Sequence, residues 1–285
     1  MSVDLHTHST RSDGVLAPEA LCARAVEAGV TLLAITDHDV LPAPMPAASD
    51  DDFHLIPGIE LTTQWNGGVV HVVGLGFRAH APHLADGVAR QCAAREVRAE
   101  KIAARLEKRG LPGALAGARA LAGDAPLGRP HFARWLVETG RVRDLDAAFR
   151  LHLSDRSLAG SDTAWATLAE AVQWITADGG VAVLAHPAKY RCTHTRLRSL
   201  VEDFKSAGGA ALEVISGLQV PATTRQLADL CRRFGLKASA GSDFHGGAGD
   251  PARLGHTNFL PSDLESVWQP WLDDATRLMP VADKA

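Results

Sequence analysis

The sequence has no apolar run long enough to cross a membrane, no paired cysteine motif and no excess of basic residues. A bilayer crossing needs about 20 consecutive apolar residues, so we expect no membrane partner. The four cysteines are scattered without a C-x-x-C pair, which argues against a disulfide framework and a zinc ribbon. A net charge of −4 excludes the broad basic surface of a non-specific duplex-DNA binder. Because polar residues begin at Asp4, we expect no secretory leader, and reduced thiols indicate a cytoplasmic protein.

Short apolar runs bounded by polar or glycine-containing segments indicate buried parallel strands. These runs cover residues 3–5, 31–36, 54–59, 69–75, 181–185, 211–215 and 237–240. Helical patterns lie between several of them, such as residues 18–28, where Pro18 stands in the first turn and Gly29 follows the last. This alternation predicts an α/β fold, either a barrel or an open sheet.

One interval breaks the alternation. About a hundred residues separate the run at 69–75 from the run at 181–185, far more than one crossover helix needs. Helical patterns fill it at 84–109, 131–139, 144–151 and 167–177. We predict a barrel domain formed by residues 1–84 and 163–285, and a helical insertion domain at 85–162 that acts as a substrate lid. Residues 41–52, rich in proline and aspartate, indicate a surface loop.

Histidines follow the first predicted strand. In an extended chain, alternating side chains place His6 and His8 on one face, close enough to bind one ion. A pair of hydrogen-bonded histidines would give the same pattern, since imidazole has many structural uses.

Similar residues recur where later strands end, and parallel α/β folds place their sites at that edge. The candidates are Asp37-His38-Asp39, Glu60, His71, His186 and Asp243 with His245. Nitrogen and oxygen donors without thiolate suit Mn²⁺, Zn²⁺ or Fe²⁺, and carboxylates can bridge two ions. Ions about 3.5–4 Å apart can activate water and stabilise both oxygens in phosphoryl displacement. The pattern therefore predicts a phosphoesterase with two or three divalent ions, Mn²⁺ first and Zn²⁺, Fe²⁺ or Mg²⁺ as alternatives.

At these residues the sequence resembles the polymerase and histidinol phosphatase (PHP) family. The motifs that carry the resemblance are residues 4–8, Ser12-Asp13-Gly14, residues 36–39, residues 57–60, His71, residues 185–187 and residues 241–245. The resemblance implies a distorted, amidohydrolase-like (β/α)₇ barrel with a trinuclear site, in which Asp13, His38 and Glu60 are central to catalysis. It implies one ion on His6, His8, Glu60 and Asp243, a second on Asp13, His38 and His245, and a third on His71 and His186 that Glu60 bridges.

Within the family, the motif Gly128-Arg129-Pro130-His131 resembles the branch that contains nucleotide 3′,5′-bisphosphate phosphatases and the exoribonuclease called ribonuclease AM. A helix starting near Pro130 would point free N–H groups outward, so that Arg129 and His131 could bind phosphate beside them. The alternative is that both side chains cap a surface helix. Where such relatives are expected to carry an element like Gly-x-Pro-Ala-Tyr, this chain has residues 157–162 with a different sequence.

Three further residues are candidates because they follow His186 closely. Lys189 and Arg191 form a cationic pair that could bind phosphate, although a solvated basic loop would have the same sequence. His194 is near enough in the chain to be considered as a general acid.

These observations predict hydrolysis of the 3′-phosphate of a nucleoside 3′,5′-bisphosphate, such as adenosine 3′,5′-bisphosphate. Two alternatives stay open, namely a 5′→3′ exoribonuclease on short 5′-phosphorylated RNA and a non-enzymatic barrel that only binds nucleotide. Every predicted metal ligand lies outside residues 85–162, whereas Arg129 and His131 lie inside. We therefore expect metal binding and substrate selectivity to be separable.

Overall fold

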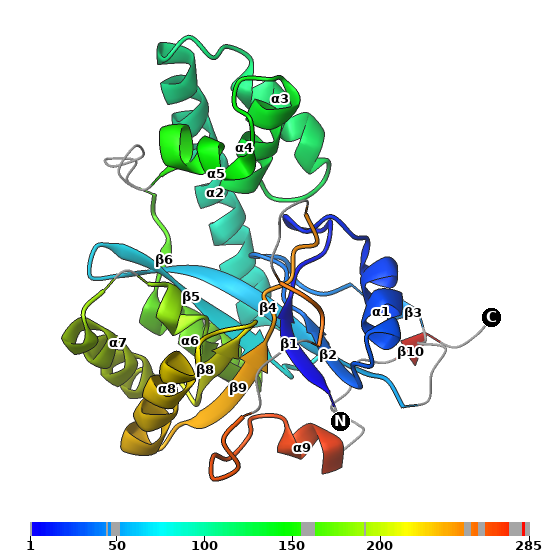
Figure 1. Ribbon diagram of the computed structural model, residues 1–285, viewed down its shortest axis with the longest axis vertical. Helices are drawn as coiled ribbons and strands as arrows, with labels where there is room; N and C mark the ends of the chain where they lie inside the picture. Colours follow the sequence, from blue (N-terminus) through cyan, green and yellow to red (C-terminus); the bar gives the residue numbers. More distant parts are fainter. Residues whose placement is uncertain are drawn as a thin grey trace.

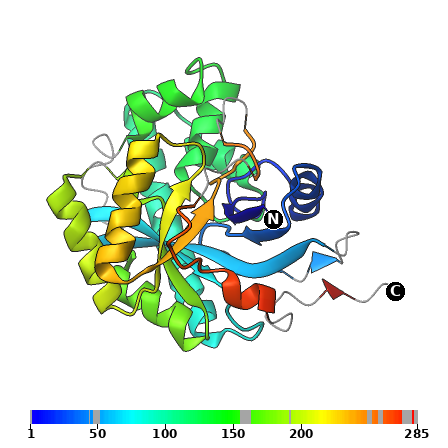
Figure 2. The same cartoon turned by 60° about the horizontal axis from the view of Figure 1, so that its bottom comes forward.

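The computed structural model describes residues 2–43, 45–46, 52–154, 163–190, 192–247, 252–255, 260–273 and 281–282. Its main sheet has eight strands in the order β1-β2-β4-β5-β7-β8-β9, with β6 paired to β4. The last strand returns beside the first, where Thr7 and Phe244 form a bridge. The sheet therefore curls into a nearly closed barrel (Figures 1 and 2). The predicted α/β barrel class is confirmed.

The strand bounds agree with the predicted runs to within a few residues, except that β4 extends well beyond its run. The strands of the main sheet are β1 (Val3–Thr7), β2 (Leu32–Ile35), β4 (His54–Trp65), β5 (Gly68–Leu75), β6 (Ala166–Thr167), β7 (Val181–Leu184), β8 (Ala211–Ser216) and β9 (Lys237–Gly241). A separate two-stranded sheet pairs β3 (Met45–Pro46) with β10 (Val281–Ala282).

The expectation that all these runs form parallel strands is wrong for β5, which is antiparallel to both β4 and β7. Asn66 and Gly67 separate β4 from β5 and have φ angles of 44° and 75°. Two successive positive φ angles are typical of the type I′ turn, whose twist matches that of a hairpin. The chain therefore reverses directly at this point, without a crossover helix.

Helices cover the outside of the barrel and form a second group above it (Figure 1). The helices are α1 (Pro18–Glu27), α2 (Pro82–Lys108), α3 (Ala114–Ala122), α4 (Arg129–Glu138), α5 (Leu145–Ala148), the π-helix η1 (Phe149–Leu153), α6 (Leu168–Ala177), the 3₁₀ helix η2 (Pro187–Lys189), α7 (His194–Ser206), α8 (Pro221–Phe234) and α9 (Gln269–Asp273).

The helices from α2 to η1 follow β5 and precede β6, and we call them the inserted helices (Pro82–Leu153). They share a hydrophobic core of their own, which includes Ile102, Leu106, Phe132 and Leu136. Helix α2 runs without a break through Ala85, where the insertion was predicted to begin. Its first turns pack on α6, and its later turns join that core. Residues 155–162 lie outside the described residues. The domain boundaries at 85 and 162 stay a prediction.

Two absences expected from the sequence can be compared with the structure. Cys22, Cys92, Cys192 and Cys231 are all free. Among the residues that the structure describes, no helix has both the length and the apolar character that a bilayer crossing requires. The cytoplasmic location stays a prediction.

Gly87 lies in α2 where that helix packs against α6. A Cβ atom at this position would lie 2.3 Å from Cε3 of Trp174. Replacing glycine by alanine inside a helix normally favours folding by about 1 kcal/mol, but a forced core contact costs about 1–3 kcal/mol. We therefore expect Gly87→Ala to lower the free energy of unfolding, measured by urea titration. The loss should shrink in a Trp174→Leu background, and a stabilised Gly87→Ala single variant would contradict the packing.

Candidate metal centre

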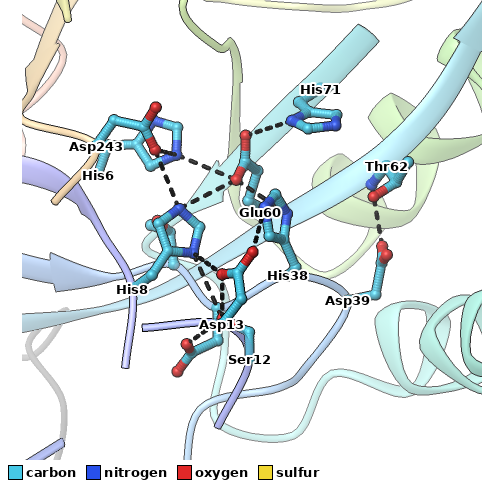
Figure 3. A network of polar contacts seen from close by, with 12 residues as sticks. His6, His8, Ser12, Asp13, His38, Asp39, Glu60, Thr62, His71 and Asp243 are labelled. Atoms are coloured by element: carbon cyan, nitrogen blue, oxygen red, sulfur yellow. Dashed lines mark hydrogen bonds and ion pairs between the residues drawn. The ribbon is translucent and has the colours of Figure 1, made fainter. Parts of the chain in front are cut away.

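The predicted metal ligands come together at one rim of the barrel, as Figure 3 shows for most of them. They come from the ends of β1, β2, β7 and β9 and from the middle of the β4–β5 hairpin. The residues brought together are His6, His8, Asp13, His38, Glu60, His71, His186, Asp243 and His245.

Glu60 is at the centre of this cluster and is fully buried. Its Oε2 atom lies 3.2 Å from Nε2 of His6, 3.2 Å from Nε2 of His8 and 3.1 Å from Nδ1 of His38. One carboxylate oxygen thus faces imidazole nitrogens from two different strand ends.

The other oxygen of Glu60 faces the opposite side of the cluster. Its Oε1 atom lies 2.8 Å from Nδ1 of His71 and 2.9 Å from Nε2 of His186. Glu60 therefore has the position of a bridging carboxylate, which can bind different ions through its two oxygens.

Within the described part of the chain, three overlapping groups of candidate ligands each have their ligand atoms within 4.8 Å of one another. The groups are His6, His8, Glu60 and Asp243; His8, Asp13, His38 and His245; and His38, Glu60 and His71. The first contains the four ligands that the family resemblance implies for one ion, and the second adds His8 to those implied for another. His186 is not in the third group, although it contacts Glu60 from the same side as His71.

The chemistry of these donors fits divalent cations. Nε2 of His6, Nε2 of His8, Nδ1 of His38 and Oε2 of Glu60 are buried and make no hydrogen bond. Buried polar atoms are seldom left unsatisfied, because each costs the free energy of its lost hydration. Lone pairs that converge without hydrogen bonds are what a bound cation would satisfy, and nitrogen with oxygen suits Mn²⁺, Zn²⁺ or Fe²⁺.

Burial and nearby charge determine the protonation of these groups. Burial lowers the pKa of His38 to about 3, so this imidazole is neutral and able to bind a cation. Burial opposes a charge on His8 as well, but the nearby carboxylates of Asp243 and Glu60 raise the pKa of His8 to about 10. Burial alone would raise the pKa of Glu60, yet the histidines around this carboxylate hold its pKa well below the usual range. A cation that binds His8 must displace its proton.

Partners outside the cluster orient the ligands, and the sequence analysis missed the most important one. Glu213 on β8 has Oε1 3.1 Å from Nδ1 of His6, and its Oε2 accepts a hydrogen bond from the backbone N–H of His186. A carboxylate that orients a ligating imidazole fixes the nitrogen that faces the ion. The available signal was a lone acidic residue inside the apolar run Ala211–Ser216.

Backbone strain accompanies three of the strand ends. Asp39, His186 and Asp243 follow β2, β7 and β9 with φ angles of 53°, 28° and 57°. Residues other than glycine rarely adopt positive φ, and such strain is concentrated at functional sites. The positions of these side chains are therefore imposed by the surrounding contacts.

A cavity of about 230 Å³ opens beside the cluster. Its lining includes candidate ligands such as His38 and His71, together with the arginines Arg95, Arg98 and Arg129. The guanidinium groups of Arg95 and Arg98 lie 5.5 Å and 5.7 Å from the ring centroid of Trp165. The arrangement can hold an anion between bound cations and fixed arginines.

Arg129 lines this cavity as the family resemblance implies, but His131 does not. The His131 side chain is buried, with Nδ1 accepting a hydrogen bond from the N–H of Gly128 at 3.0 Å and Nε2 lying 3.0 Å from the carbonyl oxygen of Ser12. Both ring nitrogens are used within the protein. The prediction that His131 binds phosphate is therefore wrong, because the ring points from α4 toward the barrel instead of into the cavity.

Lys189 is half exposed, and its Nζ contacts a carboxylate oxygen of Asp243. It therefore lies at the edge of the metal cluster, and its predicted contact with substrate stays a prediction. Arg191 and residues 157–162 lie outside the described residues.

His194 is not brought to the cluster. It begins α7 and lines a different hollow, between α7 and α8, together with Arg198 and Arg225. Tyr190, four residues earlier, packs its ring against His186 at the cluster. We therefore withdraw His194 as the general acid.

The barrel and the cluster at its strand ends define a metal-dependent phosphoesterase. The family model of the PHP domain matches residues 4–108. The chain is 42% identical, over 94% of its length and 93% of the relative, to the 5′-3′ exoribonuclease Rnm of Escherichia coli (strain K12). It is 38% identical, over 94% of its length and 95% of the relative, to the 3′,5′-nucleoside bisphosphate phosphatase of Chromobacterium violaceum.

The solved structure of an amidohydrolase from Chromobacterium violaceum, with bound sulfate and no metal, superimposes with a TM-score of 0.88 and 35% identity over 99% of each chain. The chain belongs to the PHP family and is a metal-dependent hydrolase. The alternative of a non-enzymatic barrel is set aside. The two curated relatives carry different activities, so the substrate is a separate question.

The central position of Glu60 leads to a direct test. Glu60→Gln removes the charge that faces His6, His8, His38, His71 and His186, and loss of an outer partner alone commonly lowers metal affinity about 10–100-fold. We expect the purified variant to lose bound metal, measured by mass spectrometry, and to lose more than about 100-fold in turnover, with an unchanged circular dichroism spectrum. Gln64→Ala, an exposed position on the same strand, is the matched control. Normal metal content in Glu60→Gln would contradict the central role of this carboxylate.

Proposed function

We propose that this hydrolase breaks the bond between phosphorus and O3′ of a 5′-phosphorylated nucleotide. The observation that supports the proposal is the cavity that candidate metal ligands and Arg95, Arg98 and Arg129 line together. Such a cavity offers separate places for two phosphates. The scissile 3′-phosphate would lie against the ions, and the 5′-phosphate against the arginines.

The substrate that we favour is a nucleoside 3′,5′-bisphosphate, such as adenosine 3′,5′-bisphosphate. Water adds to the 3′-phosphorus, the P–O3′ bond breaks, and O3′ leaves with a proton. The products are a nucleoside 5′-monophosphate and inorganic phosphate. A relative carries this activity in its name, and the cavity is consistent with it.

The candidate ligands would hold two or three divalent ions, with Mn²⁺ preferred and Zn²⁺, Fe²⁺ or Mg²⁺ as alternatives. When bound, the ions supply an activated water and neutralise the charge on the scissile phosphate. His6, His8, Glu60 and Asp243 would form one set of ligands, and His38 and Asp13 would belong to the next.

The cationic side chains have the complementary task of orienting the substrate. Arg129 begins α4, and its guanidinium also lies 5.9 Å from the ring centroid of Phe149, so its stem is held against the cavity wall. Binding energy from a phosphate that does not react can be used to orient the one that does. Lys189, beside Asp243, and Arg191 are proposed to contact the phosphates as well.

The second candidate function is 5′→3′ exoribonuclease activity on short RNA, which the name of another relative suggests. The chemistry is the same, because release of a 5′-mononucleotide from the 5′ end also breaks a P–O3′ bond. The shortened RNA again begins with a 5′-phosphate. An arginine wall formed by Arg95, Arg98 and Arg129 that recognises a 5′-phosphate would accept both substrates. The two substrates differ only in the group attached beyond the 3′-phosphorus.

Arg129→Ala tests the binding of the second phosphate. A charge-assisted hydrogen bond contributes about 1.5–3 kcal/mol, so we expect KM for adenosine 3′,5′-bisphosphate to rise about 10–100-fold. Hydrolysis of an aryl phosphate, which has no second phosphate, should change little. Arg141→Ala, an exposed arginine after α4, serves as the control. Equal losses on both substrates would assign Arg129 to folding or chemistry instead.

Competition between substrates tests whether one site performs both reactions. If it does, adenosine 3′,5′-bisphosphate and a 5′-phosphorylated oligoribonucleotide inhibit each other competitively, each with an inhibition constant equal to its own KM when chemistry is slow. The same oligonucleotide with a 5′-hydroxyl should inhibit much less. Hydrolysis of one substrate that is unaffected by saturating amounts of the other would rule out a shared site.

A further inference from the structure

One candidate ion group takes all four of its ligands from segments that follow strands of the main sheet. In the group of His8, Asp13, His38 and His245, Asp13 lies in the loop after β1 and His38 lies three residues after β2. The backbone of His38 forms an isolated bridge with Glu60 on β4, whereas no strand pairing within the described residues reaches Asp13. The position of Asp13 therefore depends on what packs against its loop, and that of His38 depends on this bridge and on the contacts of its neighbour Asp39.

Helix α4 contacts the loop that carries Asp13. Because Nδ1 of His131 accepts the N–H of Gly128, its proton is on Nε2, which donates to the carbonyl oxygen of Ser12 at 3.0 Å. One turn further on, Arg134 donates to the carbonyl oxygen of Asp13. The inserted helices therefore bind the backbone of two successive residues, one of them a candidate ligand.

The barrel holds the same loop from its other side. The carboxylate of Asp37 accepts hydrogen bonds from the N–H and hydroxyl of Ser9 and from the hydroxyl of Ser12, at 2.8, 2.6 and 2.6 Å. The loop thus lies between a carboxylate of the barrel and two side chains of α4. Loss of the α4 contacts would leave it held from one side only.

Helix α2 makes the second connection, to the residue after His38. The fully buried carboxylate of Asp39 accepts hydrogen bonds from Arg95 at 2.7 Å and from Gln91 at 3.0 Å, both on α2. It also accepts the N–H of Thr62 on β4 at 3.0 Å, the contact drawn in Figure 3. Asp39 has a positive φ angle, so these contacts maintain a strained turn next to His38.

The remaining ligands are held mainly within the barrel. Glu213 of β8 contacts His6 and the backbone of His186. The N–H of His71 donates to the hydroxyl of Tyr190 at 2.8 Å. The cluster therefore has two kinds of support, one from the barrel and one from the inserted helices.

We propose that the inserted helices position the Asp13 and His38 ligands, so that the ion bound by His8, Asp13, His38 and His245 depends on contacts made by His131, Arg134 and Arg95. These three act as positioning residues, because they reach the ligands only through Ser12, the Asp13 backbone and Asp39. The proposal replaces the expectation that metal binding and the insertion are separable. It rests on the proposed ion ligands but not on the identity of the substrate.

The variant His131→Asn separates positioning from helix capping. The amide oxygen of asparagine can take the place of Nδ1 of histidine and accept the N–H of Gly128. Because its side chain ends closer to the backbone than Nε2 of histidine, asparagine cannot also reach the carbonyl oxygen of Ser12. Arg134→Ala is a second, less buried variant that removes the contact with Asp13. Glu138→Gln, on the exposed end of α4, is the matched control.

The measurement is the binding of Mn²⁺ to the metal-stripped full-length protein, by calorimetry together with the electron paramagnetic resonance spectrum. For His131→Asn we expect the affinity for one ion to fall about 10–100-fold, the usual effect of losing an outer partner, while the other ions bind as in the parent. Arg134→Ala should show a smaller loss at the same ion. Glu213→Gln should show the opposite pattern, weakening the ion bound by His6 and the ion bound by His186.

The proposal is overturned if His131→Asn and Arg134→Ala both bind Mn²⁺ with parental stoichiometry and affinities, or if all ions weaken equally in a variant whose thermal unfolding matches the parent. Neither outcome depends on the substrate. If the parent protein hydrolyses neither bisphosphate nor RNA, the proposed function is refuted. If His131→Asn still loses one ion in that case, the positioning role is supported.

Discussion

The candidate metal centre is organised around one buried carboxylate. Glu60 lies in the middle of a barrel strand with both oxygens directed at imidazole nitrogens, and water has no access to it. A carboxylate in such a place requires positive charge nearby, since the loss of hydration would otherwise keep it protonated. Protonated histidines such as His8 can provide that charge, and so can divalent ions that displace their protons. The strained strand ends, the orienting carboxylates and the packed loops all keep ligands directed toward this one residue.

The sequence was sufficient to find the candidate ligands and insufficient to find what holds them. Five candidate ligands lie at or just after the carboxyl ends of strands, and these ends meet at one rim of the barrel. Their positions in the chain were therefore enough to predict that they come together. These ligands are His6, His8, His38, His186 and Asp243. The reversal at Asn66-Gly67 was also readable, because asparagine followed by glycine is a common hairpin turn, but the apolar run at 69–75 was interpreted as another parallel strand. The direction of the His131 ring and the partner of Glu213 could not be read, since both depend on contacts between segments far apart in the chain.

The two activities named among the relatives need no difference in the reacting atoms. Under the proposed function, a bisphosphate and the 5′ end of an RNA would present the same nucleotide to the cavity, with a 5′-phosphate and a P–O3′ bond in common. What distinguishes them is the space beyond the scissile phosphorus. Selectivity between them would then arise where a longer chain leaves the site, and not at Glu60 or at the arginine wall of Arg95, Arg98 and Arg129.

The β4–β5 hairpin gives the site an unusual sensitivity to chain length. Glu60 pairs with Val73, and Thr62 pairs with His71, so the alternation of side chains places Glu60 and His71 on the same face of the sheet. A residue gained or lost inside the strand between Gly68 and His71 would turn the imidazole to the opposite face unless a bulge absorbed the change. Substitutions at the intervening valines leave this parity untouched. In this part of the chain, the number of residues matters more to the ligands than their identity.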